Sequence, residues 1–167
     1  MSVADGILAG MTDTPDPVLV EMAAALALPA DQARARLGEL WDRATDPLHR
    51  CGIAHSLADL QAEVADELAW DERALAAVAD VDDARVQAAG AGAQVAAFLP
   101  SLHTNLADDH RRLGDPDRAR QHLALARASI GALGDDAYGD LLRSAVGHVQ
   151  GALDAGSTDR LPTAPSS

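Results

Sequence analysis

The sequence predicts an all-α protein. Hydrophobic residues make up 48% of the 167-residue chain, but aromatic residues make up only 2%, so the core must consist mainly of Ala, Leu and Val. Ala has the highest helix propensity of all residues, and small side chains let helices approach closely. The sequence also lacks the alternating runs of Val and Ile that are typical of strands. A chain of this length is most simply one helical domain.

Asp-Pro pairs mark the starts of several predicted helices. An Asp side chain accepts hydrogen bonds from free backbone N–H groups at a helix start, and Pro fits the first helical position. We therefore expect helices to begin at three such pairs, Asp16-Pro17, Asp46-Pro47 and Asp115-Pro116. This capping role accounts for much of the Asp content without a catalytic role.

The first half of the chain carries apolar residues at helical spacing in four segments. The segment 17–28 is nearly all apolar, and 30–45 has the stripe Leu37, Leu40, Trp41 and Ala44. In 47–62 the stripe is Ile53, Leu57 and Leu60, and in 66–80 it is Leu68, Leu75 and Val78. The sequence thus predicts four helices over these ranges, preceded by a flexible N-terminus over residues 1–14.

The second half begins with a long helical segment over 82–114, which we expect to be interrupted or kinked near Gly90, Gly92 and Pro100. Further helices are predicted over 116–133 and 137–154. The last one has an apolar face made of Leu142, Ala145, Val146, Val149 and Leu153. Residues 15–155 form the predicted helical domain, and the polar residues 156–167 form a predicted disordered tail.

The segment 101–130 resembles a tetratricopeptide repeat (TPR), a helix–turn–helix unit with small residues where its two helices cross. The matching residues are Leu106-Ala107, Leu113-Gly114, Ala119, Leu123 and Ala126. His103 and His110 stand where the repeat usually has a large apolar or aromatic residue, and the terminal Pro is missing. The chain is also similar in motif order to small bacterial TPR proteins.

A fainter copy of this unit lies upstream. Leu57-Ala58-Asp59 aligns with Leu106-Ala107-Asp108 at a separation of 49 residues, from 57 to 106. A standard unit has about 34 residues, so about fifteen extra residues are expected near 83–98.

The resemblance implies an architecture. Antiparallel helix hairpins would stack as a short TPR-like right-handed superhelix, with the two N-terminal helices and the last helix as caps, because about three units are needed to bury the apolar faces. Trp41 and Trp70 would be the large side chains of an alanine-rich core.

The resemblance also implies a concave groove lined by the first helix of each hairpin. Its expected residues are His55, Asp59, Glu63, Ser101, Thr104, Asp108 and Arg111. The TPR clamp for a terminal carboxylate needs Lys, Arg and Asn, and this chain has no Lys and has Thr104 at one key position. We therefore expect a protein-interaction module that binds a polar or basic segment of a partner protein in an acidic groove.

Charge and composition exclude several other classes of function. The formal net charge is −13, and all 13 basic residues are Arg. Without Lys the chain has no Schiff-base or phosphate-loop lysine. The acidic balance argues against nucleic acid and anionic membrane surfaces as partners.

The sequence lacks a membrane-length apolar run and a typical signal peptide, which predicts a cytoplasmic location. The single Cys51 excludes an intramolecular disulfide.

Two alternatives stay open at this point. A small all-α enzyme or metal-binding protein would use His55, Asp59 and His103, because His55 and Asp59 are four residues apart and share a helical face. His49, Cys51 and His110 are further candidates, but none of the spacings is a recognised chelating motif. No metal or cofactor is therefore predicted, and an enzyme ranks below a binding module. The second alternative is a homodimer through the apolar face of the C-terminal helix, for which we prefer the capping role.

Overall fold

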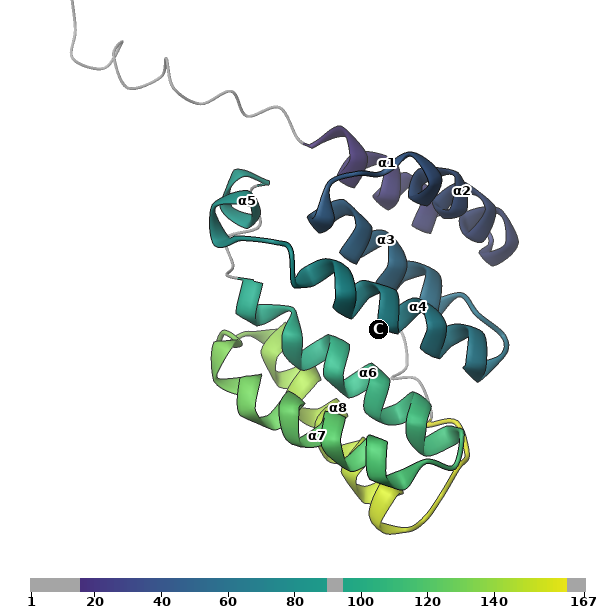
Figure 1. Ribbon diagram of the computed structural model, residues 1–167, viewed down its shortest axis with the longest axis vertical. Helices are drawn as coiled ribbons and strands as arrows, with labels where there is room; N and C mark the ends of the chain where they lie inside the picture. The colour runs from purple at the N-terminus through teal and green to yellow at the C-terminus, as the bar shows by residue number, and fades with distance from the viewer. Residues whose placement is uncertain (1–15, 90–94, 162–167) are drawn as a thin grey trace, which may run out of the picture.

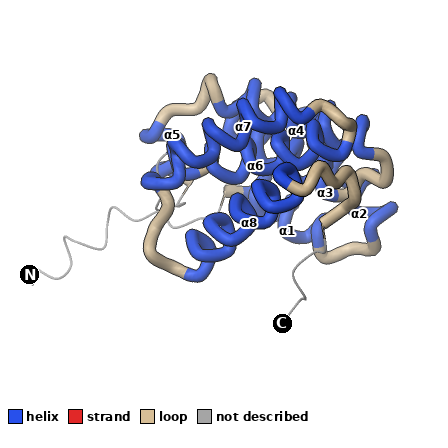
Figure 2. The backbone as a smooth tube through the Cα atoms, turned by 90° about the horizontal axis from the view of Figure 1, so that it is seen from below, coloured by secondary structure: helices blue, strands red, loops and turns tan. Residues whose placement is uncertain are grey.

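The computed structural model describes residues 16–89 and 95–161, and every regular element in these ranges is a helix (Figures 1 and 2). The all-α class is therefore confirmed, whereas the predicted flexibility of residues 1–14 lies outside the described residues. The described elements are α1 (Pro17–Leu26), α2 (Ala30–Arg43), α3 (Pro47–Asp59), α4 (Val64–Val78), α5 (Asp83–Ala88), α6 (Leu99–Arg112), α7 (Pro116–Ser129) and α8 (Ala137–Asp154), with short 3-10 turns at Val95–Ala97 and Ile130–Ala132. None of these helices is long and apolar enough to cross a bilayer.

The three Asp-Pro pairs begin helices as predicted. Asp16 Oδ1 accepts a hydrogen bond from the Val18 N–H at 3.0 Å. Asp46 Oδ1 accepts one from the Leu48 N–H at 2.9 Å, and Asp115 Oδ1 accepts one from the Arg118 N–H at 3.1 Å. In each case Pro is in the first turn, where its missing N–H costs no helical hydrogen bond.

The segment predicted as one interrupted helix over 82–114 contains separate elements. α5 ends at Ala88, a 3-10 turn follows at Val95–Ala97, and α6 begins at Leu99. Gly90 and Gly92 lie outside the described residues. Pro100 does not kink a helix, because it is in the first turn of α6, where no backbone N–H donor is needed. The described part of the extra residues between the two aligned segments thus contains α5 and the 3-10 turn.

Consecutive long helices run in opposite directions and are stacked in a row from α1 to α7, while α8 packs against both α6 and α7 (Figure 1). α3 packs closely on α4 and α6 on α7, while α4 packs on α6 and joins the two halves of the molecule. Leu57 and Ala58 of α3 are buried, and so are their aligned partners Leu106 and Ala107 of α6. The Leu-Ala pair is therefore buried in both aligned segments.

The core consists of three clusters of small and medium side chains. The first joins α1, α2 and α3, and the second joins α3, α4 and α6. Trp41 and Trp70 are partly buried and pack against both clusters, with their rings T-shaped at 5.1 Å between centroids. This packing agrees with the prediction that both tryptophans are large side chains of the core.

The third cluster joins α6, α7 and α8. It includes Val146, Val149 and Leu153 of α8, which pack against Ala107 and Leu123. The apolar face of α8 therefore packs on α6 and α7 as a cap. The buried residues of this face are not available for the alternative role, a homodimer contact.

Arg85 of α5 connects the starts of α1 and α3. Its Nε donates to Asp46 Oδ2 at 2.6 Å and its Nη2 donates to Asp16 Oδ2 at 2.9 Å. His49 Nε2 lies 2.8 Å from the same Asp16 oxygen. Burial raises the pKa of Asp16, but the hydrogen bonds from His49 and Arg85 outweigh it and lower that pKa to about 2. Asp16 and Asp46 therefore act both as helix caps and as tertiary contacts.

The chain turns back after α8. Gly156 has a left-handed φ of 64°, and the Ser157 N–H donates to Ala152 O at 3.0 Å, as in a glycine-terminated helix. Residues 157–161 then return alongside the end of α6 (Figure 1). We expected a disordered tail over 156–167, and its first six residues instead make defined contacts, because Arg111 binds their carbonyl oxygens. Residues 162–167 lie outside the described residues.

Candidate functional site

Two pockets lie one after the other along α3, α6 and α8. α3 contributes His55 to the first pocket and Asp59 to the second, which is one helical turn further on. In the same order α6 contributes Ser101 and then Thr104, and α8 contributes Tyr138 and then Leu141. The pockets have volumes of about 270 and 530 Å³. We call the face that contains them the groove.

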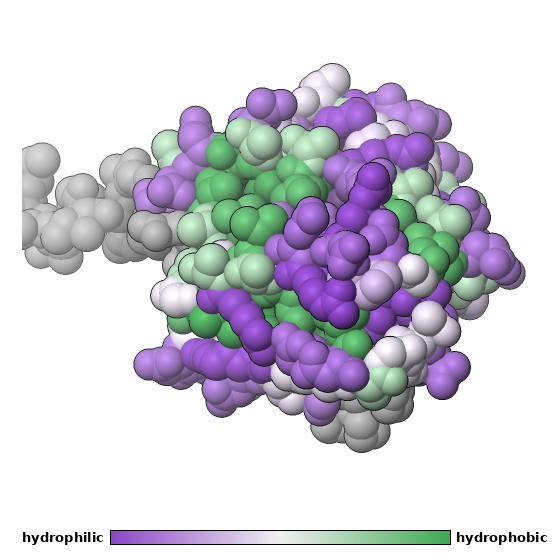
Figure 3. Space-filling view, turned by 60° about the horizontal axis from the view of Figure 1, so that its bottom comes forward, coloured by the Kyte–Doolittle hydropathy of each residue, from purple (hydrophilic) through white to green (hydrophobic). Residues whose placement is uncertain are grey.

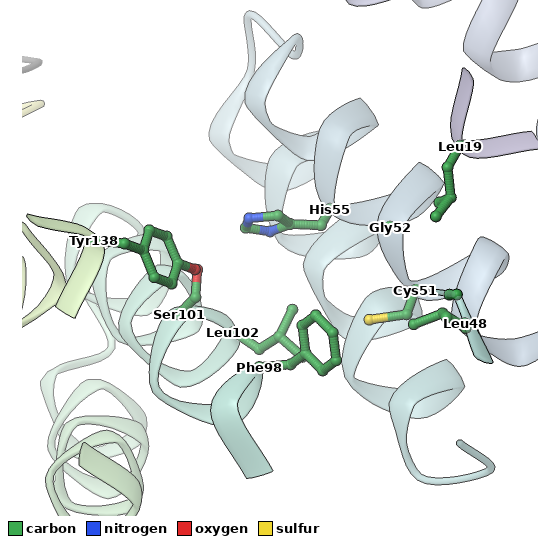
Figure 4. Close-up of a pocket in the computed structure, with 10 residues that line it drawn as sticks. Leu19, Leu48, Cys51, Gly52, His55, Phe98, Ser101, Leu102 and Tyr138 are labelled. Atoms are coloured by element: carbon green, nitrogen blue, oxygen red, sulfur yellow. The ribbon is translucent and has the colours of Figure 1, made fainter. Parts of the chain in front are cut away.

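The first pocket is mainly apolar. His55 points toward Tyr138 and Ser101 from the opposite wall, and apolar side chains form the rest of the lining (Figure 4). Phe98 and Tyr138 are the only phenylalanine and the only tyrosine of the chain, and both line this pocket. The apolar lining consists mainly of Leu19, Leu48, Cys51, Phe98, Leu102 and the ring of Tyr138.

The second pocket has a more polar lining than the first and contains charges of both signs, and we call it the polar pocket. Asp108 Oδ1 accepts from Arg111 Nη2 at 2.6 Å, and Glu67 Oε2 accepts from Arg112 Nη1 at 2.7 Å. Asp59 is exposed and makes no ion pair with any other described residue. The groove is therefore less acidic than predicted, and Asp59 is its one carboxylate without a cationic partner in the described part of the chain. Figure 3 shows hydrophobic and hydrophilic residues side by side on one face of the molecule.

The structure divides the predicted groove residues among four places. His55 and Ser101 line the apolar pocket, whereas Asp59, Thr104 and Asp108 line the polar pocket. Glu63 is at the start of α4 and lines neither pocket. Arg111 is only 2% exposed and binds the carbonyl oxygens of Ser157 and Asp159, so it is a structural residue behind the groove.

Two carboxylates are buried beneath the groove, where α4 packs on α6. Asp71 of α4 is 0% exposed and Asp109 of α6 is 1% exposed, and the Oδ2 atom of each has no hydrogen-bond partner among the described residues. Burial raises the pKa of both groups, because a charge is poorly solvated there. For Asp109 the neighbouring charges of Asp71 and Glu67 add to this effect, and its pKa is about 9. Asp109 is therefore protonated at neutral pH.

His55 links this buried site to the apolar pocket. Its side chain is 33% exposed, and its Nδ1 lies 3.4 Å from Asp71 Oδ1. Burial lowers the pKa of His55, but the hydrogen bond to Asp71 and the charges of Asp59 and Asp71 outweigh it and raise that pKa. Burial, together with the charge of Asp71, raises the pKa of the neighbouring Cys51 thiol to about 11. Cys51 is thus not a thiolate nucleophile at neutral pH.

The residues of the enzyme alternative do not form one site. The hydrogen-bond partner of His55 is Asp71 and not Asp59, while His103 Nδ1 lies 3.1 Å from His122 Nδ1. The His110 ring stacks on that of His122 at 5.4 Å between centroids. Burial lowers the pKa of all three of these histidines, to about 4 for His122. In the described part of the chain no group of three or more His, Cys, Asp or Glu is arranged to hold a metal ion.

Sequence reasoning missed Asp71 and Asp109, although the sequence carries a signal for both. Asp71 precedes Ala74 and Val78 by three and seven residues, and all three are buried on one face of α4. Asp109 follows Leu102 and Leu106 of α6 by seven and three residues, and both leucines are buried as well. A carboxylate within an apolar stripe is the pattern that identifies such residues.

Comparison with known proteins adds no relative: no protein-family model, curated protein or solved structure matches the chain. A function for the groove is therefore inferred from its geometry and charge.

Proposed function

We propose that the protein is an interaction module whose groove binds a segment of a partner protein. The segment would place an apolar side chain in the first pocket and a basic side chain next to Asp59. The observation that carries this proposal is the order of the two pockets along α3, α6 and α8, with the apolar pocket preceding the polar one on each helix.

The apolar pocket suits an anchoring side chain. Protein interfaces typically depend on a few large side chains that fill desolvated pockets. Leu48, Phe98 and Leu102 would contact such an anchor, while His55 and Ser101 would donate or accept hydrogen bonds at its edge. These polar groups favour a peptide, whose backbone offers both donors and acceptors.

The charge of the protein supports a basic residue in the partner segment. The formal net charge is −13, and Asp59 is exposed and lines the polar pocket. Such a charge attracts a basic segment at long range, and salt weakens the attraction.

The proposal includes a TPR-like superhelix for the molecule as a whole. The close packing of α3 on α4 and of α6 on α7 supports hairpin units, and the pockets are lined chiefly by α1, α3, α6 and α8. This is the distribution expected if the first helix of each unit lines the groove.

The test is a selection of 12-residue peptides from a random display library on the full chain, followed by affinity measurements with fluorescence anisotropy. Ser101→Trp fills the apolar pocket and is expected to weaken the selected peptides about tenfold or more. Asp59→Asn is expected to weaken them roughly threefold to tenfold and to reduce the salt dependence.

The matched controls are Gln121→Trp on α7 and Asp80→Asn after α4, since both positions are exposed and line neither pocket. They should leave the affinity unchanged. Selected peptides that bind Ser101→Trp as tightly as the natural chain would show that the groove is not the binding site.

A further inference from the structure

The residues after α8 lie against the polar pocket as a defined structure. We call Gly156–Leu161 the C-terminal strap. Arg111 Nη1 donates to Ser157 O at 2.6 Å, and Arg111 Nη2 donates to Asp159 O at 2.8 Å. Because Arg111 is almost fully buried, its guanidinium needs acceptors inside the protein, and the strap supplies two of them.

The strap also places two side chains in the wall of the polar pocket. Arg160 Nη2 lies 3.6 Å from Glu67 Oε2, and Leu161 packs against the core cluster of α6, α7 and α8. Both residues line the polar pocket, next to Asp108 of α6 and His148 of α8. The chain thus presents an Arg-Leu pair to the groove at the end where we place a basic residue of the partner.

We propose that the strap is an internal ligand of the groove, and that a partner segment carrying an arginine followed by an apolar residue displaces it, with backbone carbonyl oxygens of the partner replacing those of the strap at Arg111. This inference rests on the proposed function and adds its regulation and the chemistry of the partner. A tethered segment competes at a high effective concentration. The observed affinity for a partner is then reduced by the fraction of molecules in which the strap is docked.

The first measurement concerns the strap alone and needs no partner. Trypsin cleaves after Arg160, and the cleavage rate in the full chain is compared with that in a synthetic peptide of residues 155–167. A docked strap should be cleaved at least about tenfold more slowly than the peptide. Leu161→Ala removes most of the apolar contact and should speed cleavage of the full chain severalfold, whereas Leu125→Ala at an exposed site of α7 should not.

The second measurement concerns competition. The peptides selected on the full chain should bind the Leu161→Ala chain about threefold to tenfold more tightly than the natural chain. A capped peptide of residues 156–161, titrated in NMR experiments, should bind the Leu161→Ala chain. The same peptide carrying Arg160→Glu should bind at least about fivefold more weakly, because it meets Glu67 with a like charge.

The outcomes separate this inference from the proposed function. Cleavage of the natural chain at the rate of the free peptide would overturn the strap as a docked ligand. Equal affinities of the natural and Leu161→Ala chains for the selected peptides would overturn the competition and leave the proposed function intact. If no selected peptide responds to Ser101→Trp, the proposed function fails, and binding of the six-residue peptide decides whether the strap occupies its own site.

Discussion

Asp71 and Asp109 are the most unusual residues of this protein, because each is a buried carboxyl group with one oxygen that has no hydrogen-bond partner among the described residues. An isolated charge at such a position is very costly, and a carboxyl group avoids this cost by keeping its proton. The Arg112 guanidinium lies 3.6 Å from Asp109 Oδ1, but it is 2.7 Å from Glu67 and stays with that carboxylate. Asp109 therefore makes the stability of the α4–α6 contact depend on pH.

We expect Asp109→Asn to remove this dependence. The pKa of Asp109 is raised from 3.8 to about 9 in the folded protein, so the unfolded chain binds fewer protons than the folded one between these values. The free energy of unfolding of the natural chain should then fall as the pH rises from about 4 to 9. Asp109→Asn, which stays neutral, should be more stable than the natural chain at pH 9 and closest to it near pH 4.

Urea unfolding at pH 5, 7 and 9 measures this difference. Asp80→Asn serves as the control, because Asp80 is exposed after α4. If the natural chain and Asp109→Asn keep the same difference in stability at all three pH values, Asp109 does not titrate as described.

At the scale of one element, the start of α8 depends on a glycine for a steric reason. Asp136 Oδ1 accepts from the Gly139 N–H at 2.8 Å, which caps the helix. The chain before the cap folds so closely over the first turn that a Cβ on Gly139 would lie 2.1 Å from Gly134 O. A backbone atom cannot rotate away as a side chain can, so this position requires glycine.

Gly139→Ala is therefore expected to lower the free energy of unfolding by about 1–3 kcal/mol, the usual cost of overpacking. Gly147→Ala on the same helix is the matched control, since a Cβ there meets nothing within 4 Å. It should raise stability by about 0.5–1 kcal/mol, because Ala loses less backbone freedom than Gly in a helix. Urea unfolding at pH 7 compares the two variants, and a loss of stability at Gly147 equal to that at Gly139 would contradict the steric explanation.

At the scale of the whole molecule, the N-terminal and C-terminal helices are joined through α4 and α6. The carboxyl groups of Asp71 and Asp109 occupy part of this contact, so its apolar part depends on few side chains. Leu102 of α6 is 2% exposed and inserts into the cluster formed by Cys51, Ala54, Ala74 and Val78. Among the described buried members of this cluster, Leu102 comes from α6 and the others come from α3 and α4.

Leu102→Ala should lower the free energy of unfolding by about 2–5 kcal/mol, as is typical of a buried leucine. Because the lost contact joins the two halves, amide hydrogen exchange should also become faster on both sides of the junction, in α4 as well as in α6. Leu125→Ala at an exposed position of α7 should change neither quantity. Faster exchange confined to α6 would show that the halves are coupled by other contacts.

Local chemistry explains what the sequence alone determined. The Asp-Pro pairs, the apolar spacing and the alanine content act within a few residues of one another, so the all-α class and the helix starts at 17, 47, 116 and 137 were predictable. The capping role of α8 followed from one apolar face, because such a face must be covered. The groove residues His55, Ser101, Asp59, Thr104 and Asp108 came from the TPR resemblance and not from local chemistry, and each of them lines one of the two pockets.

Tertiary packing decided the partners of the polar side chains. Helical spacing paired His55 with Asp59, but the contact of α3 with α4 brings Asp71 to it instead. Arg111 was expected in the groove. Its guanidinium is instead buried and donates hydrogen bonds to the carbonyl oxygens of Ser157 and Asp159, which are 46 and 48 residues further along the chain. Hydrogen bonds of this kind depend on which helices lie side by side, and periodicity within one helix carries no information about that arrangement.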